Sequence, residues 1–160
     1  MAPGAASPGL RRLGAIVFAL AAGIGAAGCG HPAPRPLVEG VEVCDHCHMT
    51  MVERRFSAEL VSTTGRVTPF DDVGCLAMGV IAADSNRIHS LWVADYLDPD
   101  SLAPVDRMVF LRTDSIRTPM HYGIVAVRPG PAADSLVRAL AGIRLGWREV
   151  VAWARDSGAR

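Results

Sequence analysis

The alternation of apolar and polar positions predicts strands and helices that follow one another from residue 56 to residue 156. Short, partly alternating runs bounded by turn residues predict strands, and longer apolar runs behind a capping residue predict helices. The expected strands are 56–63, 66–70, 88–96, 107–112 and 122–127, with a short one at 144–147. The expected helices are 73–83, 132–141 and about 148–156. The Asp-Pro-Asp sequence at 98–100 predicts the start of a loop.

This order of elements predicts an α+β fold. It divides into ββαβ and ββα(β)α, so we expect two ββαβ-like halves in one small compact domain, although no sequence repeat relates them. Asp71 and Asp72 stand directly before the first helix, where a carboxylate can accept the free N–H groups of the first turn. We therefore expect them to cap that helix, with contact to a nearby site or partner as the alternative.

The first 28 residues are typical of a secretory signal peptide. Arg11 and Arg12 precede an uncharged, mostly apolar run, 13–27, that is too short for a comfortable transmembrane helix. The run leads to Ala-Ala-Gly-Cys, which resembles the lipobox of bacterial lipoproteins, although Ala26 stands where leucine is usual. The resemblance implies cleavage before Cys29 and lipidation of its thiol. An ordinary signal peptide with an incidental Cys29 is the alternative.

Cleavage there would leave the chain anchored by lipid on the periplasmic side of the cell envelope, at either the inner or the outer membrane. Residues 29–42 are rich in proline and predict a stiff tether, and 43–160 then form the folded domain. The 132 residues that remain (160 minus 28) are enough for one domain with a core. They carry all 16 acidic residues and 14 of the 16 arginines, a formal charge of 14 minus 16, or −2. Without a basic stripe, nucleic acid is not an expected partner.

The densest chemistry lies in residues 44–51, Cys-Asp-His-Cys-His-Met-Thr-Met. Two thiols, two imidazoles and two thioethers fall within these eight residues. Sulfur ligands select Cu(I) and other soft ions, while imidazole suits several transition metals. The i, i+3 spacing of Cys44 and Cys47 lets two thiolates converge on one ion. With Cys29 lipidated, three thiols remain, an odd number that disfavours a simple disulfide framework.

A second donor segment is Thr-Pro-Met-His at 118–121. Met120 and His121 lie at the entrance of an expected strand, where loops commonly place ligands. If this segment meets the first, sulfur from both and an optional imidazole would surround one ion.

Other donors have simpler interpretations. Core packing is favoured for Met51, Met78, Met108 and Cys75, with a ligand or redox role as the alternative for Cys75, and exposure in a loop is an equal alternative for His46 and His48.

Five short motifs follow one another between residues 43 and 127. They are Cys44-x-x-Cys47-x-Met49, Arg-Phe-Ser-Ala-Glu at 55–59, Phe-Asp-Asp-Val-Gly-Cys-Leu at 70–76, Trp-Val-Ala-Asp-Tyr at 92–96 and Thr-Pro-Met at 118–120. In this order they resemble the accessory lipoproteins of nitrous-oxide reductase (NosL type), and the lipobox fits the same family. The resemblance implies a lipid-anchored Cu(I)-binding protein, not an enzyme, with two ββαβ-type halves. Its implied partners are membrane-bound machinery that assembles copper sites, the nitrous-oxide reductase apoprotein, or both.

By motif match, the resemblance implies Cys47, Met49 and Met120 as copper ligands, with Cys44 the next candidate. The chain departs from the family pattern at two positions, because His48 and His121 stand where glycine is usual. These imidazoles could join the metal site or tune it.

Three other functions use the same residues. Cys44-x-x-Cys47-His48 spells the attachment motif of c-type haem, with Met120 as a possible distal ligand, but small c-type cytochromes are helical and this chain is rich in strands. A thiol–disulfide oxidoreductase would need a strand before the two cysteines and a helix after them, whereas a proline-rich segment precedes them. Structural zinc could use both cysteines and two histidines, which leaves the methionines without a role.

Overall fold

The computed structural model describes residues 32–158 and arranges seven strands in two antiparallel sheets. The expected signal peptide and Cys29 lie outside the described residues. Within 32–158, no helix is long and apolar enough to cross a membrane.

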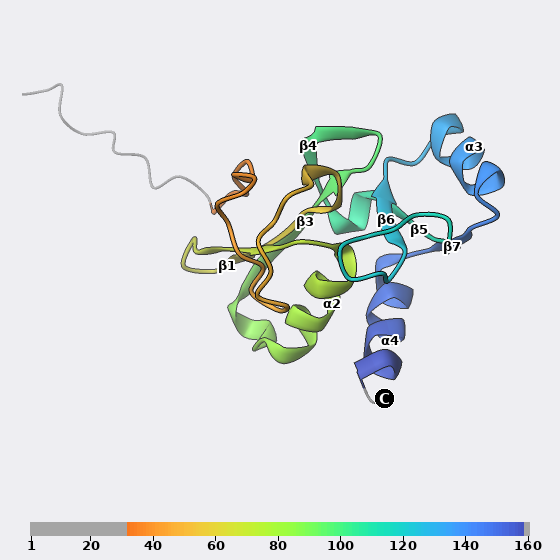
Figure 1. Ribbon diagram of the computed structural model, residues 1–160. Coiled ribbons are helices and arrows are strands. Elements are labelled where there is room, and N and C mark those ends of the chain that lie inside the picture. Colours follow the sequence, from red (N-terminus) through yellow and green to blue (C-terminus); the bar gives the residue numbers. More distant parts are fainter. Residues whose placement is uncertain (1–31, 159–160) are drawn as a thin grey trace, which may run out of the picture. The chain divides into compact units, whose positions relative to one another are not determined.

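The first half of the domain contains a four-stranded sheet and one helix. Its elements are β1 (Ala58–Ser62), β2 (Val67–Phe70), α2 (Val73–Ala82), β3 (Ile88–Asp95) and β4 (Asp98–Pro104). The strand order is β2-β1-β3-β4, so the first strand lies between the second and the third. Helix α2 connects β2 to β3 (Figure 1).

The second half repeats this plan with a three-stranded sheet. Its elements are β5 (Val109–Arg112), β6 (Ile124–Val127), α3 (Pro131–Ala139), β7 (Ile143–Leu145) and α4 (Trp147–Gly158). The order β6-β5-β7 again places the first strand in the centre, and α3 connects the second strand to the third. The expectation of an α+β fold with two ββαβ-like halves is therefore confirmed. Short 3-10 turns at Arg54–Phe56, Ser85–Arg87 and Val105–Arg107 complete the connections.

Strand β4 corrects one expectation from the sequence. The Asp-Pro-Asp segment at 98–100 begins this strand and not a loop. Two prolines fit here because β4 is at the edge of its sheet, where a residue without an N–H group need not break a ladder of hydrogen bonds. The turn into β4 is closed by the Asp95 carboxylate, which accepts the N–H of Leu97 at 3.0 Å.

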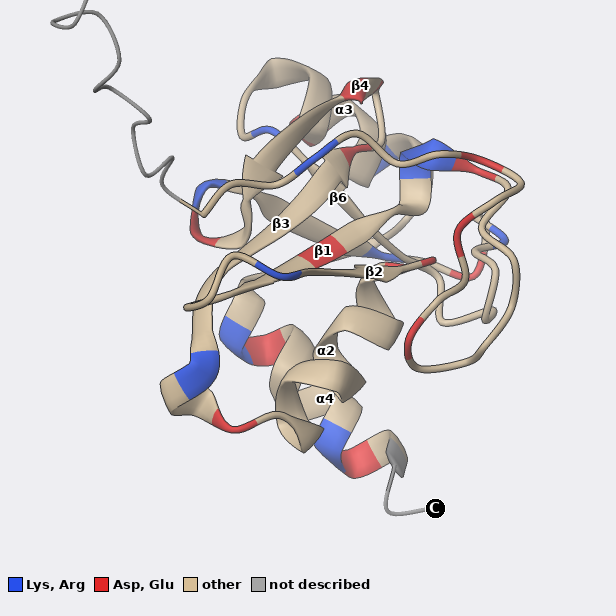
Figure 2. Cartoon of the chain, turned by 90° about the vertical axis from the view of Figure 1, so that its left-hand side faces the viewer, with Lys and Arg blue, Asp and Glu red and all other residues tan. Residues whose placement is uncertain are grey.

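The first half of helix α2 is part of the core. The helix carries no charged residue, and its first five residues are all buried. It packs against β1, β2 and α4 (Figures 1 and 2). The close approach to β2 requires a glycine, because a Cβ atom on Gly79 would lie 2.5 Å from the ring of Phe70. This packing fixes the start of α2 beneath the first cysteine segment.

The segment before β1 is held against the domain. Leu37 is 4% exposed and belongs to the core, and the Arg35 N–H donates to Oε2 of the buried Glu59 in β1 at 3.0 Å. Glu42 forms an ion pair with Arg35 and accepts the N–H of Val38 at 2.8 Å. The proline-rich segment expected to act as a tether therefore contacts the domain from Arg35 onward.

Candidate metal centre

The first cysteine segment forms the tip of a short hairpin. Its two sides are joined by the N–H of Gly40 to the carbonyl of Met51 (2.8 Å), the N–H of Met51 to the carbonyl of Glu42 (2.9 Å) and a bridge between Val43 and Thr50. We call residues 38–52 the ligand hairpin. At its tip, the N–H of Cys44 donates to the carbonyl of Met49 (2.9 Å), and the N–H of His48 donates to the carbonyl of Cys44 (3.0 Å). The cysteines thus sit in a closed turn.

One further hydrogen bond sets this turn over the junction of β2 and α2. The N–H of Asp45 donates to the carbonyl of Pro69 at 3.0 Å, close to the end of β2. The next residues along that strand lead directly to Asp71 and Asp72. Residues far apart in the sequence are therefore brought together at the first turn of α2.

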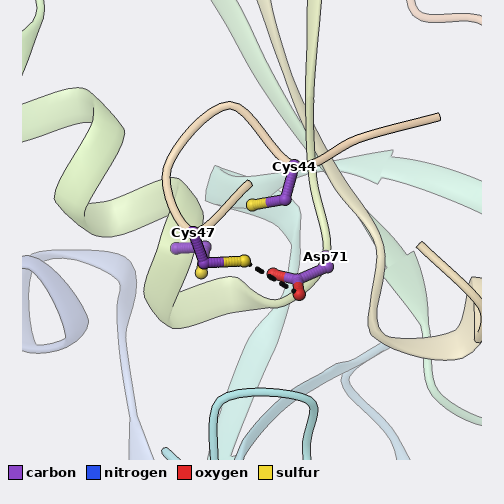
Figure 3. A group of neighbouring side chains, drawn as sticks. Cys44, Cys47 and Asp71 are labelled. Carbon is purple, nitrogen blue, oxygen red and sulfur yellow. Dashed lines mark hydrogen bonds between the residues drawn. The ribbon is translucent and has the colours of Figure 1, made fainter. Parts of the chain in front are cut away.

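The two aspartates have different positions. Asp72 is the N-cap of α2, and its Oδ1 accepts the N–H of Cys75 at 2.8 Å. Its Oδ2 accepts the N–H of Met120 at 3.3 Å, which ties the second donor segment to the same helix. Asp71 instead points to the cysteines, and its Oδ2 accepts a hydrogen bond from Sγ of Cys47 at 3.2 Å (Figure 3).

Four potential metal ligands meet at this place. One donor atom each from Cys44, Cys47, Asp71 and Cys75 lies within 4.8 Å of all the others. Four ligand atoms bound tetrahedrally at about 2.3 Å from one ion would be about 3.8 Å apart, so a small contraction would close the group around a metal. Asp71 is 3% exposed, and its Oδ1 has no hydrogen-bond partner among the described residues. A buried carboxylate oxygen without a partner is costly unless a cation satisfies it.

The thiols differ in protonation. The pKa of Cys44 falls to about 6, chiefly because the Cys75 thiol donates a hydrogen bond to its thiolate. Burial raises the pKa of Cys47 to about 12. The pKa of Cys75 is also raised, first by its hydrogen bond to Cys44 and then by burial. The hydrogen bonds and burial therefore favour negative charge on Cys44 and a proton on Cys47 and Cys75.

Access to the group is uneven. Cys44 and Cys75 are 0% exposed, whereas Cys47 is only partly buried. The ring of Tyr122 covers the start of α2 on one side of the group. It packs so closely there that a Cβ atom on Gly74 would lie 2.1 Å from the ring. Tyr122 is held in turn by an edge-on contact with Trp153 at 5.1 Å. Cys47 is therefore the most accessible of the three thiols.

The other expected ligands lie around this group. Met120 is partly buried and packs against the core, as Cys47 does. Met49 is 48% exposed, and His48 and His121 are exposed. Met51, expected in the core, is 1% exposed and belongs to it.

Both histidines occupy unusual backbone positions. The φ angles of His48 and His121 are 60° and 58°, in the left-handed region that favours glycine. Glycine would adopt this conformation without strain, so both positions are ones where a side chain is costly.

Cys75 is a donor for which the sequence favoured core packing, with a ligand or redox role as the alternative. An apolar helix around it favoured an inert buried thiol, and the thiol is indeed buried. The signal that could have found it is its place three residues after the capping Asp72, in the first turn of a helix that follows a strand directly. A thiol there faces the same sheet end as the loop cysteines.

Fold and site together define a small α+β protein with a partly accessible, thiol-rich candidate metal centre. No family model matches the sequence, and no curated protein matches it. Among solved structures, the chain is similar to the crystal structure of the copper chaperone NosL from Shewanella denitrificans. The TM-score is 0.60 with 16% identity, over 72% of this chain and 96% of that one. This likeness shows a shared fold.

Proposed function

We propose that the protein is a Cu(I)-binding accessory protein, lipid-anchored on the periplasmic side of the envelope, that delivers copper for the maturation of nitrous-oxide reductase. The observation that carries the metal-binding part is the group of three thiols and one carboxylate within 4.8 Å. The shared fold with a copper chaperone and the motif resemblance support copper as the metal. The anchor and the client rest on the lipobox and on the resemblance.

The donor set is suited to a reduced, soft ion. Cu(I) needs few ligands and prefers sulfur, so two or three of the thiolates of Cys44, Cys47 and Cys75 would satisfy it. The Cys47 thiol already donates a hydrogen bond to Asp71, so its sulfur faces the carboxylate that completes the group. Because Cys47 is the most accessible thiol, a partner's ligand would meet the ion there and take it by ligand exchange. Met120 and Met49 would supply thioether donors on that path.

Zinc is the competing metal, because a set of three cysteines and one aspartate can fill a tetrahedral site. The structure favours this set over the two cysteines and two histidines expected for zinc, since no histidine belongs to the group found among residues 32–158. A four-coordinate site would retain zinc and serve stability, whereas a site that transfers copper must release it. Relative affinity therefore separates the two functions.

Covalent haem fits the geometry poorly. Cys44 is 0% exposed, and its Sγ faces Cys75 and Asp71, so a porphyrin could not reach both cysteines without opening this packing. The oxidoreductase arrangement is absent from the described residues around the motif, because the cysteines lie in a hairpin turn and not between a strand and a helix.

Metal content provides the test. The full chain would be purified anaerobically with a reductant from cells supplied with copper, and copper, zinc and iron per chain would be measured. We expect about one copper per chain that zinc does not displace. Zinc that resists Cu(I), or iron with a haem absorption band, would contradict the proposal. The client would be tested by the copper content of nitrous-oxide reductase in cells that lack this protein, and the anchor by mass spectrometry of the mature N-terminus.

A further inference from the structure

The ligand hairpin carries most of the large apolar side chains that are exposed in residues 32–158. Five of the eight large apolar side chains that are exposed in residues 32–158 come from it: Val38, Val41, Val43, Met49 and Val52, exposed by 48 to 71%. The hydrogen bonds between 40–42 and 51 and the bridge between Val43 and Thr50 bring its two sides together. We call these five side chains the apolar rim. Single exposed apolar residues are ordinary, but five on one hairpin beside a candidate metal-binding turn indicate an interaction site.

We propose that the apolar rim is the docking surface for the protein that exchanges metal with the thiol group. The inference rests on the proposed function and adds the place and the chemistry of the partner. The partner would present apolar side chains that cover the rim and lysine or arginine side chains beside them. It would place a soft metal ligand opposite Cys47.

The first reason is continuity between rim and site. Cys47 lies in the turn of the same hairpin. In the chain it stands between Val43 and Met49, which both belong to the apolar rim. Since Cys44 and Cys75 are fully buried, a partner can reach the metal only through the accessible side at Cys47. A surface that docks on the rim would cover this opening and exclude water during transfer. Apolar centres of interfaces act in this way.

The second reason is charge. Residues 38–53 contain four carboxylates and no lysine or arginine. Glu39 and Glu42 are paired with arginines outside this stretch, but Asp45 and Glu53 are exposed and take part in no ion pair within the described part of the chain. Unpaired carboxylates beside an apolar surface favour a partner with lysine or arginine at the rim of its own interface. They disfavour a bilayer with anionic lipids, which repels them.

The test compares two acceptors for Cu(I). One is apo nitrous-oxide reductase, and the other is the small chelator bathocuproine disulfonate, which needs no docking surface. The variant combines Val41→Ser, Val43→Ser and Val52→Ser in the full chain. The matched controls are Ile143→Ser in β7 and Leu97→Ser before β4, which are exposed by 60% and 50% and lie outside the hairpin.

We expect the triple variant to bind Cu(I) with wild-type affinity and to release it to the chelator at the wild-type rate. Transfer to the apoprotein should slow by about tenfold or more, since loss of a few central apolar contacts costs more than about 1 kcal/mol. The control variants should transfer at the wild-type rate. Asp45→Arg should also slow transfer to the apoprotein, most strongly at low salt.

Three results would overturn the inference while the proposed function stands. One is an equal rate of transfer to the apoprotein by the triple variant and the wild type. Another is an equal slowing of transfer to the apoprotein and to the chelator in the triple variant, which would place the defect in metal release and not in docking. The third is a triple variant that no longer binds vesicles of phosphatidylethanolamine and phosphatidylglycerol but still transfers copper at the wild-type rate. This result would identify the rim as a lipid-binding surface. Failure of the wild type to bind Cu(I) would instead contradict the proposed function itself.

Discussion

Sγ of Cys47 donates a hydrogen bond to Oδ2 of Asp71 at 3.2 Å, across 24 positions of the chain. This contact joins the turn of the ligand hairpin to the residue that precedes the capping residue of α2. It explains why the candidate metal centre is a property of the fold and not of the cysteine motif alone. The hairpin supplies two thiols, and the junction of β2 and α2 supplies the third thiol and a carboxylate.

The first prediction concerns Cys75. Cys75→Ser removes one of three thiols while keeping a small polar side chain in the first turn of α2. We expect Cu(I) affinity to fall by at least about 10- to 100-fold, measured by competition with a chromophoric chelator. Ala77→Ser is the matched control, because it places a hydroxyl at another fully buried position of the same helix and removes no donor. Equal affinities of the two variants would show that Cys75 is an inert core thiol.

The second prediction concerns Asp72, which caps α2 and holds the Met120 backbone. Asp72→Ala should lower the free energy of unfolding by about 1–2 kcal/mol or more, because it removes an N-cap and leaves buried N–H groups without acceptors. Asp72→Asn keeps one acceptor oxygen for the Cys75 N–H and loses the acceptor for the Met120 N–H, so it should lose less than Asp72→Ala. Urea unfolding of the metal-free protein measures both. A larger loss for Asn than for Ala would contradict the capping role.

Much of the fold follows from local patterns that the sequence displays. Alternation and capping residues predict β1, β2, α2, β3, β5 and β6 within a few residues, and they also predict the two-half order. Strand β4 could not be predicted in this way. Its prolines and aspartates indicate a loop, and only its position at the sheet edge, a tertiary property, makes them acceptable.

The candidate site was predictable only in part, for a related reason. Cys44 and Cys47 are distinctive because donors cluster around them in the sequence. Cys75 stands alone among apolar residues, and its proximity to them depends on the hydrogen bond from Asp45 to Pro69 that sets the hairpin over α2. A separation of 28 to 31 residues carries no local signal of this kind.

The third prediction is a pH dependence of stability that arises from Glu59. Burial raises the pKa of this carboxyl above its ordinary value of 4.5. The folded protein thus binds this proton more tightly than the unfolded chain, so the contribution to stability is fully present below pH 4.5 and declines as pH rises through the folded pKa. Glu59→Gln keeps an acceptor for the Arg35 N–H and carries no charge, so it should stabilise the protein at neutral pH and reduce this decline.

Urea unfolding at a series of pH values checks this expectation. Glu53→Gln, at an exposed position, is the matched control and should leave the pH profile of stability unchanged. If Glu59→Gln has the same profile as the wild type, the buried carboxyl does not contribute to the pH dependence.

The last prediction uses the two histidines with positive φ. A residue with a Cβ atom in the left-handed conformation costs roughly 1–2 kcal/mol, and glycine avoids this cost but loses about 0.5–1 kcal/mol through its greater freedom in the unfolded chain. His48→Gly and His121→Gly should therefore each stabilise the metal-free protein by up to about 1 kcal/mol in thermal or urea unfolding. His89→Gly, at an exposed position inside β3, should destabilise it by a similar amount. Since both imidazoles lie outside the group of four donors, Cu(I) affinity should stay within about threefold of wild type. A loss of affinity beyond tenfold in either variant, with stability raised as expected, would place that imidazole on the metal.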